Sequence, residues 1–219
     1  MNPPDWSWLN NNISKIVDLT GQHLVLALAP VVAALVLSIP IGYLISLSGK
    51  ASNAILAVFG LIYAIPSLAL FVAMPVILGT QILAPINIAA ALTVYAVALL
   101  VRSVVDGLRG VPAEVKRSAS AMGYGRVRRL FAVELPLSMP VIFAGLRVVT
   151  VSNIALVSVG EVIGLGALGS LFSLGFNKAF YTPIVVGLVL TVVLALIADG
   201  LILLLQRGTL PWFRKQGTA

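Results

Sequence analysis

Residues 102–136 read RSVVDGLRGVPAEVKRSASAMGYGRVRRLFAVELP and form the longest charged segment of an otherwise apolar chain. The segment holds seven of the fourteen basic residues and three of the seven acidic ones, and therefore carries +4 of the net charge of +7. Side chains with this charge cannot lie in the hydrocarbon of a membrane. The sequence therefore predicts an aqueous loop, residues 106–136, between two membrane spans.

Two short helices are predicted within this loop. Pro112 suits the first position of a helix, and an apolar stripe follows at helical spacing, made of Val115, Ala119 and Met122. Gly123 suits the end of that helix. A short amphipathic helix in an aqueous loop is typical of a segment that docks on a partner protein.

The second loop helix is predicted from about Arg126 to Leu135, where Pro136 would end it. The basic charges alone also fit a loop that merely obeys the positive-inside rule. A helix-turn-helix that binds DNA is disfavoured, because the segment is tethered at both ends to apolar spans and lacks a partner domain. Nucleic acid is therefore not an expected partner.

The composition indicates one all-α integral membrane domain. The chain has 219 residues, of which 60% are hydrophobic and 10% charged, and its mean hydropathy is +1.09. A soluble domain has about 25% charged residues. Helices satisfy every backbone hydrogen bond within lipid, and the apolar runs are too continuous for barrel strands, in which polar residues alternate. Because there is no cysteine, disulfides and thiolate metal ligands are excluded.

Five spans are predicted, at about residues 23–46, 53–77, 85–105, 137–159 and 184–205. They would be flanked by an extracytoplasmic segment, residues 1–22, without the features of a removable signal peptide, and by a cytoplasmic tail, residues 207–219. Pro66 and Ser67 interrupt the second span near its middle. The glycine-rich residues between the fourth and fifth spans are expected to form an extracytoplasmic loop with a short, partly inserted helix.

The distribution of basic residues sets the expected orientation. With the central loop in the cytoplasm, eleven basic residues lie on the inner side and two, Lys15 and Lys178, on the outer side. A chain of five spans then has its N-terminus outside and its C-terminus in the cytoplasm. The expected location is the cell membrane.

The loop resembles the "EAA" loop of permease subunits of type I, binding-protein-dependent ABC importers. That motif reads E-A-A, three residues, G, nine residues, I, one residue, L-P. Here Gly123 is followed by nine residues, then by Val133, and two positions later by Leu135 and Pro136. The resemblance implies a MetI-like fold of five transmembrane helices with a cytoplasmic coupling helix.

In that family the loop seats in a groove of a cytoplasmic ATPase. Ala119 fills the third letter of the motif, whereas Arg117 and Ser118 stand where the family has Glu-Ala, a departure that concerns details of docking. The resemblance thus implies a set of ATPase-docking residues: Glu114, Val115, Arg117, Ser118, Ala119, Met122, Gly123, Leu135 and Pro136.

Other stretches resemble the osmoprotectant subfamily. They are HLVLAL (23–28), SIPIGYLISLSG (38–49), IYAIPSLALFV (62–72) and GLGALG (164–169). This resemblance implies import of a compatible solute such as glycine betaine, choline, carnitine, proline or proline betaine. The alternatives are an amino-acid permease of the methionine type, a secondary transporter driven by an ion gradient, and a membrane scaffold without transport.

The chain has no ATP-binding P-loop sequence and no metal-binding H-E-x-x-H sequence, so it is not expected to be an enzyme, to hold a metal or to carry a cofactor. The resemblance implies that ATP and magnesium bind to a cytoplasmic ABC ATPase dimer. It also implies a second permease subunit, identical or different, and an extracytoplasmic substrate-binding protein. An aromatic cage for a quaternary ammonium would belong to that binding protein, because the spans have few aromatic residues.

Two charges are predicted inside spans. Arg147 and Asp199 each lie about 12–15 Å from the cytoplasmic end of their span, at ~1.5 Å per residue. Because an unpaired intramembrane charge is costly, the two are expected to form an ion pair, unless Arg147 extends to the interface. The lone histidine, His23, is expected at the membrane interface.

The candidates for the translocation pathway or its gate are Tyr63, Pro66, Ser67, Arg147, Asn153 and Asp199. Polar groups at this depth also serve as contacts between packed helices, so a structural role is the alternative for each of them.

Overall fold

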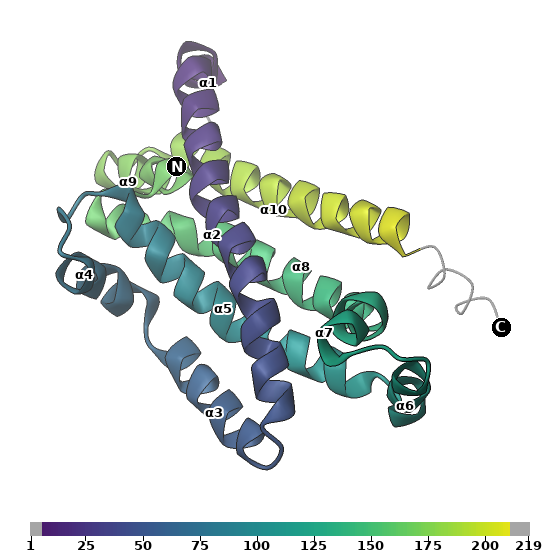
Figure 1. Ribbon diagram of the computed structural model, residues 1–219. Coiled ribbons are helices and arrows are strands. Elements are labelled where there is room, and N and C mark those ends of the chain that lie inside the picture. The colour runs from purple at the N-terminus through teal and green to yellow at the C-terminus, as the bar shows by residue number, and fades with distance from the viewer. Residues whose placement is uncertain (1–5, 211–219) are drawn as a thin grey trace.

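The structure is a computed structural model and describes residues 6–210 (Figure 1). The predicted extracytoplasmic segment is thus described only from residue 6, and residues 211–219 of the predicted tail, with Arg214 and Lys215, lie outside the described part. The α-helices are α1 Trp6–Asn11, α2 Ile13–Leu47, α3 Ala51–Ala64, α4 Ser67–Leu78, α5 Pro85–Gly110, α6 Ala113–Ala121, α7 Arg126–Arg129, α8 Leu135–Val159, α9 Ser170–Asn177 and α10 Tyr181–Thr209. A π turn, η1 Leu130–Glu134, joins α7 to α8, and two 3-10 turns, η2 Gly160–Ile163 and η3 Ala167–Gly169, follow α8.

Four helical stretches are long and apolar enough to cross a membrane, namely α2, α5, the continuous helix Arg126–Ile163, and α10. The pair α3 and α4 would be a fifth span, bent by 97° at its break. Within the described residues 6–210 there is no strand. The prediction of an all-α membrane protein is therefore confirmed.

The bend between α3 and α4 lies at Pro66, where the sequence analysis placed an interruption. Pro66 has no backbone N–H, so the helix cannot continue through it with regular hydrogen bonds. The Ile65 N–H bonds to the Ile62 carbonyl at 3.2 Å, and the Ile65 carbonyl accepts a hydrogen bond from the Tyr95 hydroxyl of α5. The buried tyrosine thus satisfies a carbonyl exposed by the break.

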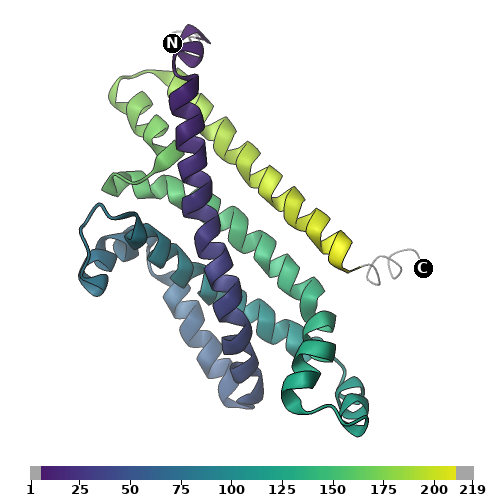
Figure 2. The ribbon, with the colours of Figure 1, turned by 45° about the horizontal axis from the view of Figure 1, so that its top comes forward.

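Helices α2 and α8 pack on α5, and α10 joins this group through α8. Helix α2 lies along α5 and α8, α8 also packs on α5, and α10 lies against α8 and α9 (Figures 1 and 2). Small residues let α5 and α8 approach closely: a Cβ atom added to Gly107 would lie 3.1 Å from the Ser138 Cβ atom.

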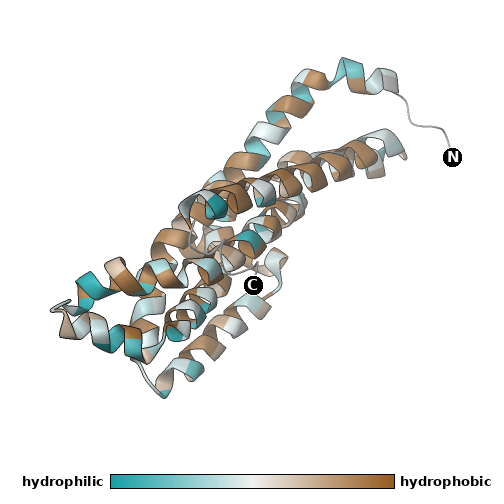
Figure 3. Cartoon of the chain, turned by 90° about the vertical axis from the view of Figure 1, so that its right-hand side faces the viewer, coloured by the Kyte–Doolittle hydropathy of each residue, from teal (hydrophilic) through white to brown (hydrophobic). Residues whose placement is uncertain are grey.

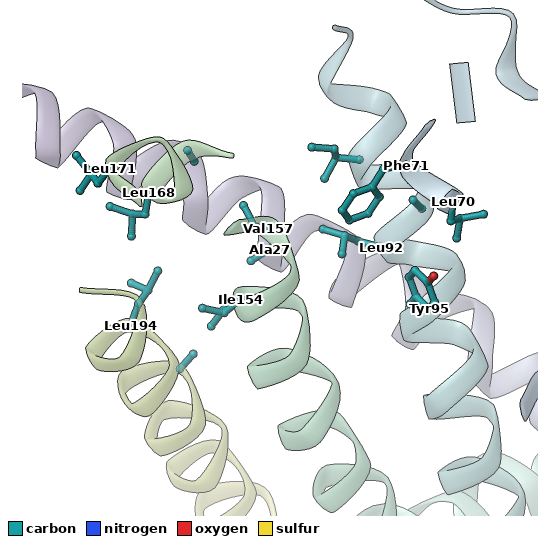
Figure 4. Close-up of a cluster of buried hydrophobic side chains, with 14 of the residues drawn as sticks. Ala27, Leu70, Phe71, Leu92, Tyr95, Ile154, Val157, Leu168, Leu171 and Leu194 are labelled. Atoms are coloured by element: carbon teal, nitrogen blue, oxygen red, sulfur yellow. The ribbon is translucent and has the colours of Figure 1, made fainter. Parts of the chain in front are cut away.

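The largest apolar cluster joins side chains from α2, α4, α5, α8, η3, α9 and α10. Figure 4 shows Ala27 of α2, Phe71 of α4, Leu92 of α5, Ile154 of α8 and Leu168 of η3 in one group. All five side chains are buried. The glycine-rich segment that follows α8 is therefore packed into the core through η3, rather than lying free as a loop.

Apolar side chains also cover the outside of the molecule. Hydrophobic positions run along the lengths of the helices in Figure 3. On α10 the exposed large apolar side chains include Leu188, Val189, Leu196, Ile197 and Leu201. Such a surface is suited to lipid or to another membrane subunit.

Several helices extend beyond the predicted spans. Helix α2 begins at Ile13, ten residues before the predicted start at His23, and α5 continues to Gly110 instead of ending at 105. Hydropathy marks the apolar part of a helix, whereas backbone hydrogen bonding continues past it into the polar flanks.

The second loop helix does not end at Leu135, so this prediction is wrong. Helix α7 passes through the π turn η1 directly into α8. The Leu135 N–H bonds to the Leu130 carbonyl, five residues earlier. A π turn of this kind widens the helix immediately before Pro136, and the chain continues where a proline would otherwise end or kink it.

Candidate functional site

The first loop helix, α6, begins after Pro112 and ends at a Schellman motif. Pro112 is the N-cap residue rather than the first helical residue, because its φ and ψ are −56° and 140°. At the other end the Gly123 N–H bonds to the Ser120 carbonyl at 3.0 Å, and the Tyr124 N–H bonds to the Ala119 carbonyl at 3.1 Å. Gly123 has a φ of +85°, a conformation that favours glycine.

The predicted docking residues of α6 lie on two different faces. The exposed residues are Glu114, Arg117, Ser118, Met122 and Gly123. Ala119 is only 2% exposed, and Val115 is half-buried, so both face the rest of the chain. The stripe Val115–Ala119–Met122 is therefore divided, and Ala119 is not accessible for docking.

The Leu-Pro end of the motif belongs to the core. Leu135 is buried in an apolar cluster with Val104 and Leu108 of α5, Leu130 of η1 and Ile142 of α8. Pro136 is half-buried at the start of α8. Leu135 therefore anchors the loop to the spans.

Arg147 of α8 and Asp199 of α10 form a bidentate ion pair, as the sequence predicted. The Arg147 Nε atom lies 2.6 Å from Asp199 Oδ1, and Nη2 lies 2.7 Å from Oδ2. The two parallel hydrogen bonds match the planar guanidinium to the carboxylate. The side chains remain 37% and 27% exposed, so the pair lies at an open surface between the two helices.

Asp199 also borders a cavity of about 500 Å³ between α8 and α10. Its other walls are apolar side chains and Thr191. The cavity therefore has one ion pair at the edge of an apolar groove.

The other pathway candidates separate into two groups. Tyr63 is exposed at 41% and packs its ring edge-on against Tyr95, with centroids 5.8 Å apart, beside Pro66 and Ser67 at the bend. Asn153 is buried and its amide lies 3.4 Å from the Ala27 carbonyl of α2. Asn153 thus has the geometry of a contact between packed helices.

His23 faces the interior of the helix bundle, rather than lipid or water. The imidazole is fully buried, and its Nε2 atom lies 2.8 Å from the Ile154 carbonyl of α8. His23 therefore serves as a contact between α2 and α8.

Sequence analysis missed one cluster of charges in the loop. Glu134 of η1 is 5% exposed, and its carboxylate pairs with Arg129 and Lys116. A carboxylate between Val133 and Leu135, in an otherwise apolar run, was the available signal. Residues that could hold a metal as a group of three or more are absent from residues 6–210.

The fold and the loop together define a membrane-spanning permease subunit, and comparison with known proteins identifies the family to which it belongs. Residues 21–210 match the family described as the binding-protein-dependent transport system inner membrane component, and the chain belongs to this family. It is a multi-pass permease subunit of an ABC importer, which works with an ATPase and a binding protein, and ATP hydrolysis belongs to the separate ATPase.

Individual proteins that this chain resembles are also permease subunits of transport systems. The choline transport system permease protein OpuBD of Bacillus subtilis is 31% identical over 94% of this chain and 90% of its own length. The osmoprotectant import permease protein OsmW of Salmonella typhimurium is 31% identical over 91% of this chain and 94% of its own length.

A solved structure agrees with the fold. A chain of the inward-facing MetNI methionine ABC transporter has a TM-score of 0.81 and 21% identity, over 91% of this chain and 98% of that chain. The predicted MetI-like fold is confirmed. The osmoprotectant resemblance agrees with the relatives, which also favour the importer over a secondary transporter.

Proposed function

We propose that this permease subunit imports compatible solutes with a quaternary ammonium group, such as choline, glycine betaine or carnitine. The observation that carries the proposal is the match, over more than nine-tenths of the chain, to permeases named for choline and for osmoprotectants. The methionine-type alternative rests on likeness of fold, which is shared among transporters of different substrates.

Uptake by the complete transporter tests the substrate. Cells that contain this permease, its ATPase and its binding protein are expected to accumulate radiolabelled choline or glycine betaine, and an excess of the unlabelled solute should suppress that uptake. Unlabelled methionine serves as the matched competitor. Uptake of methionine without uptake of any quaternary ammonium solute would contradict the proposal.

The proposed assembly has two permease subunits, identical or different, and two ATPases that bind ATP and magnesium. Each ATPase would dock on the exposed face of α6, which presents Arg117, Ser118 and Met122. An extracytoplasmic binding protein would deliver the solute. Closure of the ATPases would move α6 and, through it, the spans α5 and α8. This movement of the spans would open the pathway to one side of the membrane and then to the other.

The proposed topology has α6 in the cytoplasm and α9 outside, with the N-terminus outside and the C-terminus inside. Eleven basic residues against two support this orientation, and α6 and α9 lie at opposite ends of the molecule in Figure 2.

Cysteine labelling tests this topology, because the chain has no cysteine of its own. In intact cells an impermeant thiol reagent is expected to label Asn177→Cys, on the exposed end of α9, and to leave Ser118→Cys unlabelled until the cells are opened. Both positions are exposed, so the difference reports the side of the membrane. Labelling of Ser118→Cys in intact cells would refute the orientation.

A further inference from the structure

Glu134 lies at the junction between the loop and the span α8. It is the last residue of the π turn η1, its side chain is 6% exposed, and its two carboxylate oxygens face two different cations. Arg129 Nε donates to Oε1 at 2.7 Å, and Lys116 Nζ lies 3.7 Å from Oε2. A buried carboxylate with two cationic partners is held in one position.

Both cations are bonded onward to other elements. Arg129 Nη1 donates to the Ser120 hydroxyl of α6 at 2.7 Å. Lys116 itself belongs to α6, and its Nζ atom donates to the Leu108 carbonyl of α5 at 2.8 Å. Glu134 is thereby connected to α6 directly through Lys116 and indirectly through Arg129, and to the end of α5 through the same lysine.

Glu134 is also fixed to α8. The Ser138 hydroxyl, one turn into that helix, donates to the Glu134 carbonyl at 2.7 Å, and Leu135 packs in the apolar cluster next to it. The π turn contains one residue more than a regular turn, and this shifts the face on which Glu134 projects relative to the helix that follows.

Helix α6 has little else to hold it. It has nine residues, is joined to α5 by Val111–Pro112 and to α7 by residues 122–125, and contributes one buried side chain, that of Ala119. The only other apolar side chain of α6 that faces the rest of the chain, Val115, is half-buried. The charged contacts around Glu134 therefore add a second connection between α6 and the spans, besides this apolar packing.

We propose that Glu134 is a positioning residue that makes α6 and α8 move as one rigid unit. A displacement of α6 by the ATPase then reaches α8 instead of being absorbed by the two short linkers. The proposal rests on the docking of the ATPase at α6, and it adds the contact through which that movement enters the spans. Its loss would uncouple ATP hydrolysis from transport without separating the subunits.

The variant Glu134→Gln removes the charge and keeps the size of the side chain. Two measurements on the complete transporter in lipid nanodiscs test its effect: hydrogen exchange of the amides of residues 113–123, and solute transported per ATP hydrolysed. The variant loses the charged contacts of Glu134 with Arg129 and Lys116. Hydrogen exchange of residues 113–123 is therefore expected to rise about tenfold, and the solute transported per ATP to fall about tenfold, while the ATPase stays bound.

Arg126→Gln is the matched control, because this arginine lies in the same helix as Arg129 but is exposed and is not a partner of Glu134. It is expected to leave both measurements at the wild-type value. Glu134→Asp, which retains the charge, should restore part of the transport ratio, which a simple loss of core packing would not explain.

Ser120→Ala removes only the exposed hydrogen bond between Arg129 and the Ser120 hydroxyl. It tests the proposal if the Glu134→Gln complex does not assemble. It is expected to raise hydrogen exchange in α6 by a smaller factor. Wild-type exchange and transport ratio in Ser120→Ala, or in an assembled Glu134→Gln complex, would overturn the proposal. Hydrogen exchange of α6 is measured without any solute. It therefore distinguishes a failure of the proposed role of Glu134 from a wrong substrate or a wrong docking face.

Discussion

Replacing Asp199 by leucine is expected to remove most of the uptake or of the assembled transporter, and replacing Arg147 by leucine is expected to do the same. Each change leaves the other charge without its bidentate partner at a position within the spans. An unpaired charge at that depth is costly, and it draws water or lipid headgroups into the bundle. Uptake and the yield of purified complex measure the effect.

The double variant Arg147→Leu/Asp199→Leu removes both charges and is expected to recover part of the loss, because an ion pair replaced by apolar residues is often tolerated. Arg147→Lys is a matched control that keeps the charge but cannot form two parallel hydrogen bonds. Partial recovery in the double variant would show that the pair holds α8 against α10. Purely additive losses would contradict this, and would indicate that each residue acts through a different partner.

Hydropathy and depth predicted the features that depend on the membrane. Four apolar stretches became long helices, since a span has to satisfy its backbone within lipid. The bend at Pro66 followed from the missing N–H of proline. The pair Arg147–Asp199 followed from similar depth on consecutive spans, because few partners are available inside a bilayer.

Features that depend on rotation about a helix axis were not predictable in the same way. Pro136 indicated the end of a helix, whereas a π turn allows the helix to continue, and a single sequence does not reveal such a turn. The inward direction of Ala119 is set by how α6 lies on the spans rather than by its own apolar pattern. That the His23 imidazole faces α8 likewise depends on the rotation of α2 about its axis, which a single sequence does not reveal.

Replacing Gly123 by aspartate is expected to prevent the ATPase from binding to the permease. Gly123 and Met122 are the exposed end of α6, and the proposed docking places them inside the ATPase groove. A carboxylate there would be buried without a partner, which costs on the order of 3 kcal/mol or more and weakens docking about a hundredfold or more. Co-purification of the ATPase with the tagged permease measures the loss, while the amount of permease in the membrane shows that insertion is intact.

The matched control is Gly123→Asn, since asparagine has the shape of aspartate without the charge and tolerates a positive φ. No atom lies within 4 Å of the position of an added Cβ, so the permease itself has room for either side chain. Gly123→Val tests the backbone, because a β-branched residue is strained at a φ of +85°. If docking buries this position, aspartate abolishes co-purification and asparagine weakens it less. If Gly123 serves only to end the helix, aspartate and asparagine behave alike and valine is the most damaging, and the docking proposal for this end of α6 would be wrong.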